Sequence, residues 1–229
     1  MTIPPGTVNP RHSLPSRIGQ SPIRPARCLP SPRAVTVRWL SGLVNVVAVA
    51  RFGGMDRKVL ARRIHQAAHL TGEFTLRSGA VSNEYFDKYR FEADPALLLD
   101  ICEFMAELVP NDIDALAGLE LGGVPIATMV SSLTGRPALF VRKKAKEYGT
   151  CKLAEGPDVV GRRVTLVEDV ITTGGAVRDA TNALREAGAI VEVVVCAIDR
   201  SPAGENPLAD VGLEVRPVLT KAQLDAVRG

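Results

Sequence analysis

The stretch that decides the fold is residues 164–177, Val-Thr-Leu-Val-Glu-Asp-Val-Ile-Thr-Thr-Gly-Gly-Ala-Val. Apolar and β-branched residues run into two adjacent acids, and a short Thr/Gly turn then leads into a helical pattern. This order predicts a strand, a turn and the beginning of a helix. Such a turn directs backbone N–H groups at one anion, and the helix dipole favours the negative charge. The turn residues with this predicted role are Thr172, Thr173, Gly174 and Gly175.

The two acids, Glu168 and Asp169, stand just before this turn. A carboxylate repels a phosphate group, but it suits the neutral hydroxyls of a ribose. The motif therefore predicts a sugar-phosphate ligand. The chain has no Gly-x-x-x-x-Gly-Lys-Ser/Thr sequence at this turn, which excludes the loop of P-loop NTPases here. An ordinary strand–turn–helix with acids at its mouth is the alternative.

Strand and helix patterns alternate on both sides of the motif. Their order predicts an α/β fold in which helices flank a parallel, twisted sheet and ligands bind at the carboxyl ends of the strands. A smaller pair of strands around a Gly turn is expected at 73–79 and 82–89. The expected strands of the main sheet are 114–119, 138–142, 163–168, 190–198 and 213–218. The expected helices are 56–70, 95–109, 124–134, 176–187 and 220–228.

Charge separates the amino-terminal segment from the rest of the 229 residues. Residues 1–54 hold seven of the 28 basic residues, all Arg, and no acid, so the remainder has 21 basic against 25 acidic residues and a net charge of −4. A mildly acidic domain does not suggest a nucleic-acid partner. The four cysteines lack Cys-x-x-Cys spacing, which favours isolated thiols over disulfides or zinc.

Residues 1–54 are interpreted as a disordered Arg/Pro-rich leader or a mis-assigned translation start. Eight prolines in residues 1–33 predict disorder. The apolar stretch 39–50 is shorter than the roughly 20 residues that span a bilayer. A transit peptide, a secretory signal and a start at Met55 each fit this composition, which favours the last. The folded domain is then 55–229, and a cytoplasmic location is expected.

The acid pair and the turn after it resemble the phosphoribosyl-pyrophosphate (PRPP) signature of type I phosphoribosyltransferases. In that family the two acids hold the 2- and 3-hydroxyls of the ribose, and the loop holds the 5-phosphate. The resemblance implies the first role for Glu168 and Asp169. It implies the second for the four turn residues 172–175.

A basic segment follows the predicted strand 138–142. Residues 142–150, Arg-Lys-Lys-Ala-Lys-Glu-Tyr-Gly-Thr, hold four cations within five positions. A solvated charged loop is one interpretation. The segment also resembles the catalytic loop of orotate phosphoribosyltransferases, which binds pyrophosphate, although many members have His where this chain has Tyr. The corresponding residues are Arg142, Lys143, Lys146 and Tyr148, and the resemblance implies that Lys146 and Asp169 are catalytic.

Two further segments resemble the orotate site of that family. Residues 74–79, Phe-Thr-Leu-Arg-Ser-Gly, with Tyr85-Phe86 resemble the amino-terminal hood strands, where a basic residue and aromatics contact the pyrimidine. Arg200, at the end of an apolar strand pattern, resembles the residue that recognises orotate. The alternatives are simple packing of the aromatics and an ion pair from Arg200 to Asp199 or Glu205. The implied orotate-binding residues are Arg77, Tyr85, Phe86, Thr172 and Arg200.

Residues 118–125, Gly-Leu-Glu-Leu-Gly-Gly-Val-Pro, resemble the family's pyrophosphate loop with one departure. Several members have Tyr-Lys where this chain has Leu121-Gly122. A pyrophosphate contact is therefore either missing or made by backbone amides.

These resemblances together imply a type I phosphoribosyltransferase fold, with a small hood at about 56–92 and a core at about 93–220. They imply transfer of the phosphoribosyl group of PRPP to orotate, giving orotidine 5'-monophosphate and pyrophosphate in pyrimidine biosynthesis. They also imply a homodimer with shared active sites and Mg²⁺ bound mainly through PRPP, without dedicated metal ligands. Neither a nucleic acid nor a membrane is expected as a partner. The alternatives are a phosphoribosyltransferase for another base and a non-catalytic, PRPP-sensing regulator.

Overall fold

The computed structural model describes residues 55–75, 79–143 and 153–228, within the compact unit Ala50–Gly229. The predicted leader lies outside these residues, as do Arg77, Lys146 and Tyr148.

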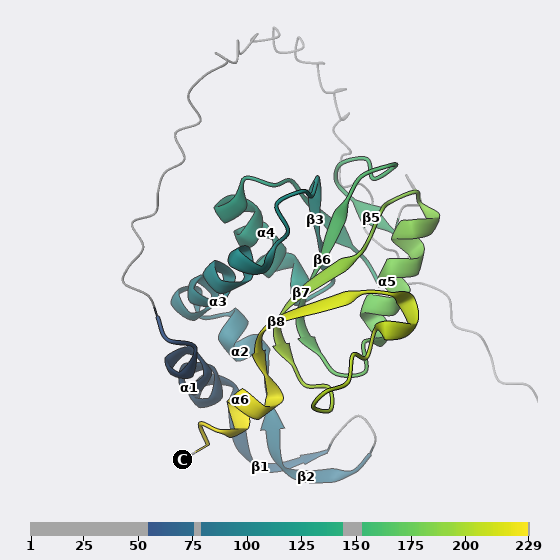
Figure 1. Cartoon of the computed structure of the whole chain (residues 1–229). Coiled ribbons are helices and arrows are strands. Elements are labelled where there is room, and N and C mark those ends of the chain that lie inside the picture. The colour runs from purple at the N-terminus through teal and green to yellow at the C-terminus, as the bar shows by residue number, and fades with distance from the viewer. Residues whose placement is uncertain (1–54, 76–78, 144–152, 229) are drawn as a thin grey trace, which may run out of the picture. The chain divides into compact units, whose positions relative to one another are not determined.

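A six-stranded sheet forms the centre of the domain, with the strand order β5-β4-β3-β6-β7-β8 (Figure 1). All neighbouring strands pair in parallel except β5, which runs antiparallel to β4 at one edge. This arrangement confirms the predicted, mainly parallel α/β fold. The strands are β3 (Ala115–Leu119), β4 (Ala138–Val141), β5 (Ala154–Glu155), β6 (Val164–Ile171), β7 (Val193–Asp199) and β8 (Glu214–Thr220).

Helices cover both faces of this sheet, as the alternating pattern predicts. In Figure 1, α5 lies on one side of the strands, and α3 and α4 lie on the other. Successive residues of β3 supply both interiors: Leu116 joins the hydrophobic cluster that contains Ile126 of α4, and Ala117 joins the cluster that contains Val177 of α5. The helices are α1 (Arg57–Ala68), α2 (Tyr89–Glu92), α3 (Pro95–Leu108), α4 (Gly123–Thr134), α5 (Gly175–Glu186) and α6 (Lys221–Asp225), with a 3-10 turn at Ala209–Val211.

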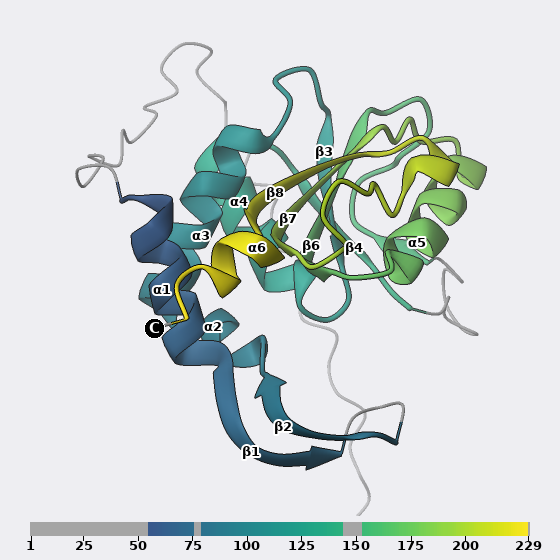
Figure 2. The ribbon, with the colours of Figure 1, turned by 60° about the horizontal axis from the view of Figure 1, so that its bottom comes forward.

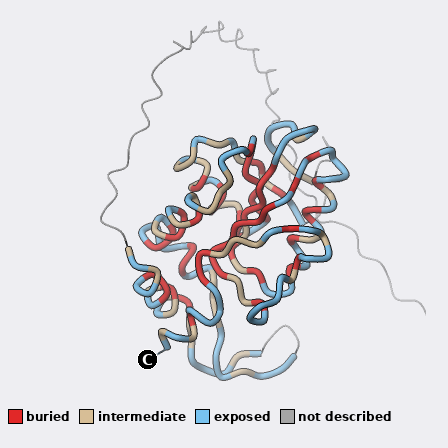
Figure 3. Tube along the Cα trace, in the orientation of Figure 1, coloured by how far each residue is buried: buried red, intermediate tan, exposed pale blue. Residues whose placement is uncertain are grey.

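The central strands are buried along most of their length (Figure 3). Every residue of β3 is buried, and β7 is buried up to its last residue, Asp199. Two helix starts follow the local signals in the sequence. Asp56 accepts a hydrogen bond from the Lys58 N–H, and Asp94 caps α3 with Pro95 in the first turn. Cys102 and Cys196 are buried, free thiols.

The two-stranded sheet of β1 (His69–Thr75) and β2 (Val81–Phe86) forms the predicted hood, which extends from the rest of the domain in Figure 2. The expected boundary was wrong: α1 ends at Ala68, not Leu70, and His69 is already extended. The reason is strand pairing, because His69 lies opposite Phe86, and this pairing overrides the continuing helical pattern.

Other differences are small and concern short elements. The last helix ends at Asp225 rather than 228. The expected polar loop at 142–160 contains the two-residue strand β5, and the four-residue helix α2 was not predicted. Elements this short carry too few residues for a periodic pattern, so tertiary contacts decide them.

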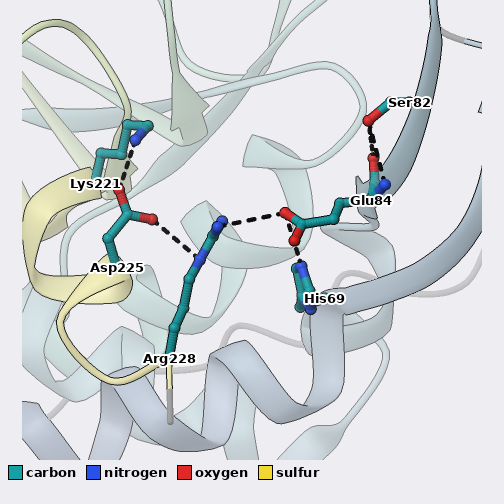
Figure 4. A network of polar contacts seen from close by, with 6 residues as sticks. All are labelled: His69, Ser82, Glu84, Lys221, Asp225 and Arg228. Atoms are coloured by element: carbon teal, nitrogen blue, oxygen red, sulfur yellow. Dashed lines mark hydrogen bonds and ion pairs between the residues drawn. The ribbon is translucent and has the colours of Figure 1, made fainter.

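Figure 4 shows a polar network that joins the hood to the carboxyl-terminal segment. His69 of β1 and Arg228 both contact the carboxylate of Glu84 in β2, at 3.2 and 3.3 Å. Arg228 also pairs with Asp225 of α6 at 3.2 Å. Each exposed pair contributes little alone, but together they connect two elements that are distant in sequence.

Close contact between β3 and α4 positions the loop that joins them. A Cβ atom on Gly118 of β3 would lie 2.7 Å from the Cβ atom of Ala127 and 3.0 Å from the Gly123 carbonyl carbon. Real side chains do not approach so closely, so the absence of a side chain at residue 118 lets the helix begin directly above the strand.

We expect Gly118→Ala to lower the free energy of unfolding by about 1–3 kcal/mol, because α4 must move away from β3. Urea denaturation followed by circular dichroism measures the change. Gly175→Ala is the matched control for stability, since a Cβ there meets nothing within 4 Å. Equal stability of the two variants would show that the strand and helix do not constrain residue 118.

Candidate active site

The predicted anion cradle lies where β6 ends and α5 begins. Thr172, Thr173 and Gly175 are exposed, whereas Gly174 is buried and has a left-handed backbone with φ +72°. A Cβ on Gly174 would come within 2.7 Å of the Leu208 side chain, so both the space and the backbone favour glycine. The N–H groups of the first turn of α5 have no partner within the helix, as at any helix start. The turn therefore offers donors to an anion from solvent.

Asp169, near the end of β6, is fully buried. Its carboxylate forms an ion pair with the Lys88 ammonium and accepts a hydrogen bond from the Val170 N–H. Lys88 lies between β2 and α2, at the junction of hood and core. Burial disfavours the charge on Lys88, but the hydrogen bond and the charge of Asp169 outweigh it, and the pKa of Lys88 is raised.

Two more carboxyl groups lie beside Asp169. Burial, followed by the nearby charge of Asp169, raises the pKa of Glu168 to about 9. The same two causes raise the pKa of Glu92, in α2, to about 8. Glu168 Oε2 and Glu92 Oε1 are buried and accept no hydrogen bond from the described residues. These oxygens are therefore candidates to contact the hydroxyls of a ligand.

The loop between β3 and α4 closes the other side of this cluster. A Cβ atom on Gly122 would overlap the Asp169 carboxylate, lying 2.6 Å from its Cγ atom, and would lie 2.9 Å from Glu92 Oε1. The departure from Tyr-Lys at 121–122 thus has a structural counterpart, because the carboxylate occupies the space that a side chain at 122 would need. The loop also contains a cis peptide bond between Glu120 and Leu121.

The predicted base-binding residues are only partly brought together. The Arg200 guanidinium lies 5.2 Å from the ring centroid of Phe86. Tyr85, the next residue along β2, instead has its ring 5.4 Å from that of Phe74 and is 43% exposed. Neighbouring side chains of a strand point to opposite faces, so Tyr85 and Phe86 have different partners.

Arg200 forms no ion pair with a carboxylate among the described residues. The two ion-pair partners that the sequence offered, Asp199 and Glu205, are both among these residues. Asp199 instead accepts a hydrogen bond from the Ser201 N–H at 2.9 Å. A cavity of about 560 Å³ opens beside Arg200. It is lined by the loop 199–205 and by residues 220–222 and 225. The guanidinium is therefore available to an anionic or carbonyl-bearing ligand.

The basic segment begins at the carboxyl ends of the strands, as the cradle does. Arg142 and Lys143 follow β4 and are exposed, and the Arg142 N–H donates to the Leu153 carbonyl at 2.9 Å. Because β5 pairs with β4 in the antiparallel sense, the chain before and after the basic segment lies side by side. Lys146 and Tyr148 lie outside the described residues, so their predicted roles stay predictions.

Lys88 and Glu92 are the site residues that sequence reasoning missed. Both lie about 80 residues before Asp169, and no motif marks them. One signal was present: they are four residues apart, a spacing that places two side chains on one face of a helix.

Two further features of the described residues bear on partners. No group of three or more His, Cys, Asp or Glu side chains there has the arrangement of a metal site. No helix in the same residues is long and apolar enough to cross a membrane.

A second cavity, of about 320 Å³, lies among the first residues of β6, β7 and β8, at the opposite end of the strands from the cradle.

Comparisons with known proteins show the family to which the chain belongs. The phosphoribosyl transferase domain family matches residues 90–215. An orotate phosphoribosyltransferase of Nocardioides sp. is 78% identical over 169 residues, covering 74% of this chain and 94% of that protein. One of Methanocella arvoryzae is 40% identical over 170 residues, covering 74% of this chain and 97% of that protein.

Solved structures give the same result. The Mycobacterium tuberculosis orotate phosphoribosyltransferase in complex with Fe(III) dicitrate aligns with a TM-score of 0.66 and 37% identity, covering 74% of this chain and 99% of that one. The same enzyme in complex with PRPP aligns with a TM-score of 0.63 and 33% identity, covering 75% of this chain and 99% of that one.

The chain belongs to the phosphoribosyltransferase family and, within it, to the orotate phosphoribosyltransferases.

Titration of Glu92 gives a test of the acid cluster in the absence of ligand. Its pKa is raised from 4.5 to about 8, so the folded protein binds this proton more tightly than the unfolded chain does. The stability that the proton contributes is complete below the unfolded pKa and is lost as the pH rises through the folded one. As the pH rises from about 5 to about 9, we expect the melting temperature of Glu92→Gln to fall less than that of the parent.

Scanning calorimetry across this range measures the difference. Glu103→Gln, at an exposed position of α3, is the control and should follow the parent. A Glu92→Gln curve parallel to the parent's would show that Glu92 does not titrate in this range.

Proposed function

We propose that this chain transfers the phosphoribosyl group of PRPP to orotate, giving orotidine 5'-monophosphate and pyrophosphate in pyrimidine biosynthesis. The observation that carries the proposal is the position of three groups at one end of the sheet. The anion cradle 172–175 and the acid pair Glu168–Asp169 lie at the end of β6, and Arg200 follows the neighbouring strand β7. The cradle suits a phosphate, the acid pair suits the hydroxyls of a ribose, and Arg200 suits an anionic base. These are the three parts that PRPP and orotate would place side by side.

The residues would act mainly by positioning and electrostatics. The cradle would hold the 5-phosphate, and the acid pair would hold the ribose hydroxyls. Arg200 would orient the orotate so that its ring nitrogen faces the anomeric carbon. As the ring nitrogen bonds to the anomeric carbon, the bond from that carbon to the pyrophosphate oxygen would break, and the N–H proton of the ring would pass to the departing pyrophosphate or to water. The charge of Asp169 would stabilise the positive charge that develops on the ribose. Arg142 and Lys143, with Lys146 and Tyr148 of the same segment, would face the leaving pyrophosphate.

Magnesium is proposed as a companion of PRPP rather than a resident ion. The pyrophosphate and ribose hydroxyls of PRPP offer oxygen ligands, the type that Mg²⁺ accepts. Mg²⁺ retains several waters and readily takes oxygens from substrate phosphates, so few protein ligands are needed. When bound, the ion would neutralise charge on the pyrophosphate.

Base choice gives the direct test of the proposed function. Arg200→Ala should lower kcat/KM for orotate by about tenfold to several hundredfold, because a charge-assisted contact in a closed site is lost. PRPP affinity, measured by calorimetry, should change little. Arg136→Ala is a control, since this arginine lies after α4 and binds the Asn111 carbonyl.

The unaltered protein should convert orotate in the presence of PRPP and Mg²⁺ and should use uracil, hypoxanthine and adenine far less. Equal turnover of uracil and orotate would favour a phosphoribosyltransferase for another base. PRPP binding with no turnover of any base would favour the regulator.

We also propose a cytoplasmic homodimer in which the basic segment of one subunit reaches the site of the other. The support is the family resemblance of residues 142–150 and the position of Arg142 and Lys143 at the edge of the sheet. Lys146→Ala and Asp169→Asn should each be nearly inactive alone. Mixing them in equal amounts should restore roughly a quarter of the parent activity, because half of the dimers are mixed and each has one intact site. Failure to recover activity, with subunit exchange verified by native mass spectrometry, would place the segment in its own subunit's site.

A further inference from the structure

Lys88 is a residue of the site that has no assigned role in the proposed reaction. It belongs to neither the cradle nor the acid pair, and it lies on the short connection between β2 and α2. Its side chain is one-third exposed, and its ammonium nevertheless contacts a carboxylate with no exposed surface. Because Asp169 is buried, loss of this cation would leave its charge unpaired, which costs more than the loss of an exposed ion pair.

The contact between Lys88 and Asp169 lies beside Gly122, and this position indicates that it fixes the orientation of the Asp169 carboxylate. Lys88 Nζ binds Asp169 Oδ2, the same oxygen that a Cβ atom on Gly122 would overlap. The Asp169 carboxylate is thus confined between a cation from the hood side and a glycine of the loop that precedes α4. If either neighbour changed, the carboxylate would have to turn.

Lys88 also balances the charge of the three acids. Its charge lowers the pKa of both Glu92 and Glu168, whereas Asp169 raises both, and Asp87 adds to the effect on Glu92. A buried carboxylate without a cation is strongly disfavoured, so Lys88 determines how this cluster distributes its protons.

We propose that Lys88 is a positioning residue for the ribose site: its ammonium holds the Asp169 carboxylate in the space above Gly122, so the hood fixes the acid that faces the substrate. This inference rests on the proposed function, in which Asp169 contacts the ribose. It assigns to the hood a second task besides contact with the base. It also gives Gly122 a role, since any side chain there would push Asp169 away from Lys88.

A double-mutant cycle tests the coupling. Lys88→Met removes the charge and retains the length, and Lys88→Arg retains the charge. We expect Lys88→Met to lower kcat by about tenfold to a hundredfold, and Lys88→Arg to recover most of the loss. Lys58→Met, at an exposed position in α1, should match the parent.

Gly122→Ala should lower kcat by about tenfold or more in the parent, because the new Cβ displaces Asp169. In the Lys88→Met background the same change should cost less than about threefold, because Asp169 is already free to turn. Equal losses in the two backgrounds would overturn the inference, since they would show that residues 88 and 122 act independently.

A readout without substrate keeps the inference separate from the proposed function. In protein labelled with ¹³C at the glutamate carboxyls, Lys88→Met should move the titrations of Glu92 and Glu168 to higher pH. Lys58→Met should leave both unchanged. Unmoved titrations in Lys88→Met would contradict the inference even if orotate is converted. If the parent fails to convert orotate while the titrations move as stated, the proposed function fails and the coupling of Lys88 to the acid cluster stands.

Discussion

The ion pair between Asp169 and Lys88 is the interaction on which the arrangement of the site depends. It joins the end of the central strand β6 to the hood, two parts of the chain separated by 81 positions. Asp169 has no exposed surface, and a carboxylate in such a place requires a cation and hydrogen bonds to remain charged. The rest of the site follows from this requirement. The strand places the acid, the glycine loop leaves space for it, and α2 brings Glu92 beside it.

A cluster of three acids, in which burial raises the pKa values of Glu92 and Glu168, suits a site that awaits a ligand. The pKa values of about 8 and about 9 for Glu92 and Glu168 are the consequence of burial beside the charge of Asp169. A substrate that brings hydroxyls and cations would replace the missing hydrogen bonds of Glu168 and redistribute these protons. The features that make the ligand-free site unfavourable are therefore those that the proposed sugar-phosphate ligand would satisfy.

The sequence predicted those parts of the site that are local in the chain. The strand, acids, turn and helix of residues 164–186 were readable because each follows from its neighbours. It could not show which groups meet across the fold. Lys88 and Glu92 carry no motif, and their role appears only when their side chains lie beside Asp169 in the fold. Nor could the sequence show that the Arg200 guanidinium lies over the ring of Phe86 while the ring of Tyr85 lies near that of Phe74.

The central claim is that the acids at the end of β6 bind the ribose of PRPP while the turn after them binds its 5-phosphate. A crystal structure of the chain with PRPP and Mg²⁺ tests this most directly. The account predicts density for the 5-phosphate at the amides of residues 172–175 and for the ribose hydroxyls at Glu168 and Asp169. Density for PRPP at another place, such as the cavity among the first residues of β6, β7 and β8, would contradict it.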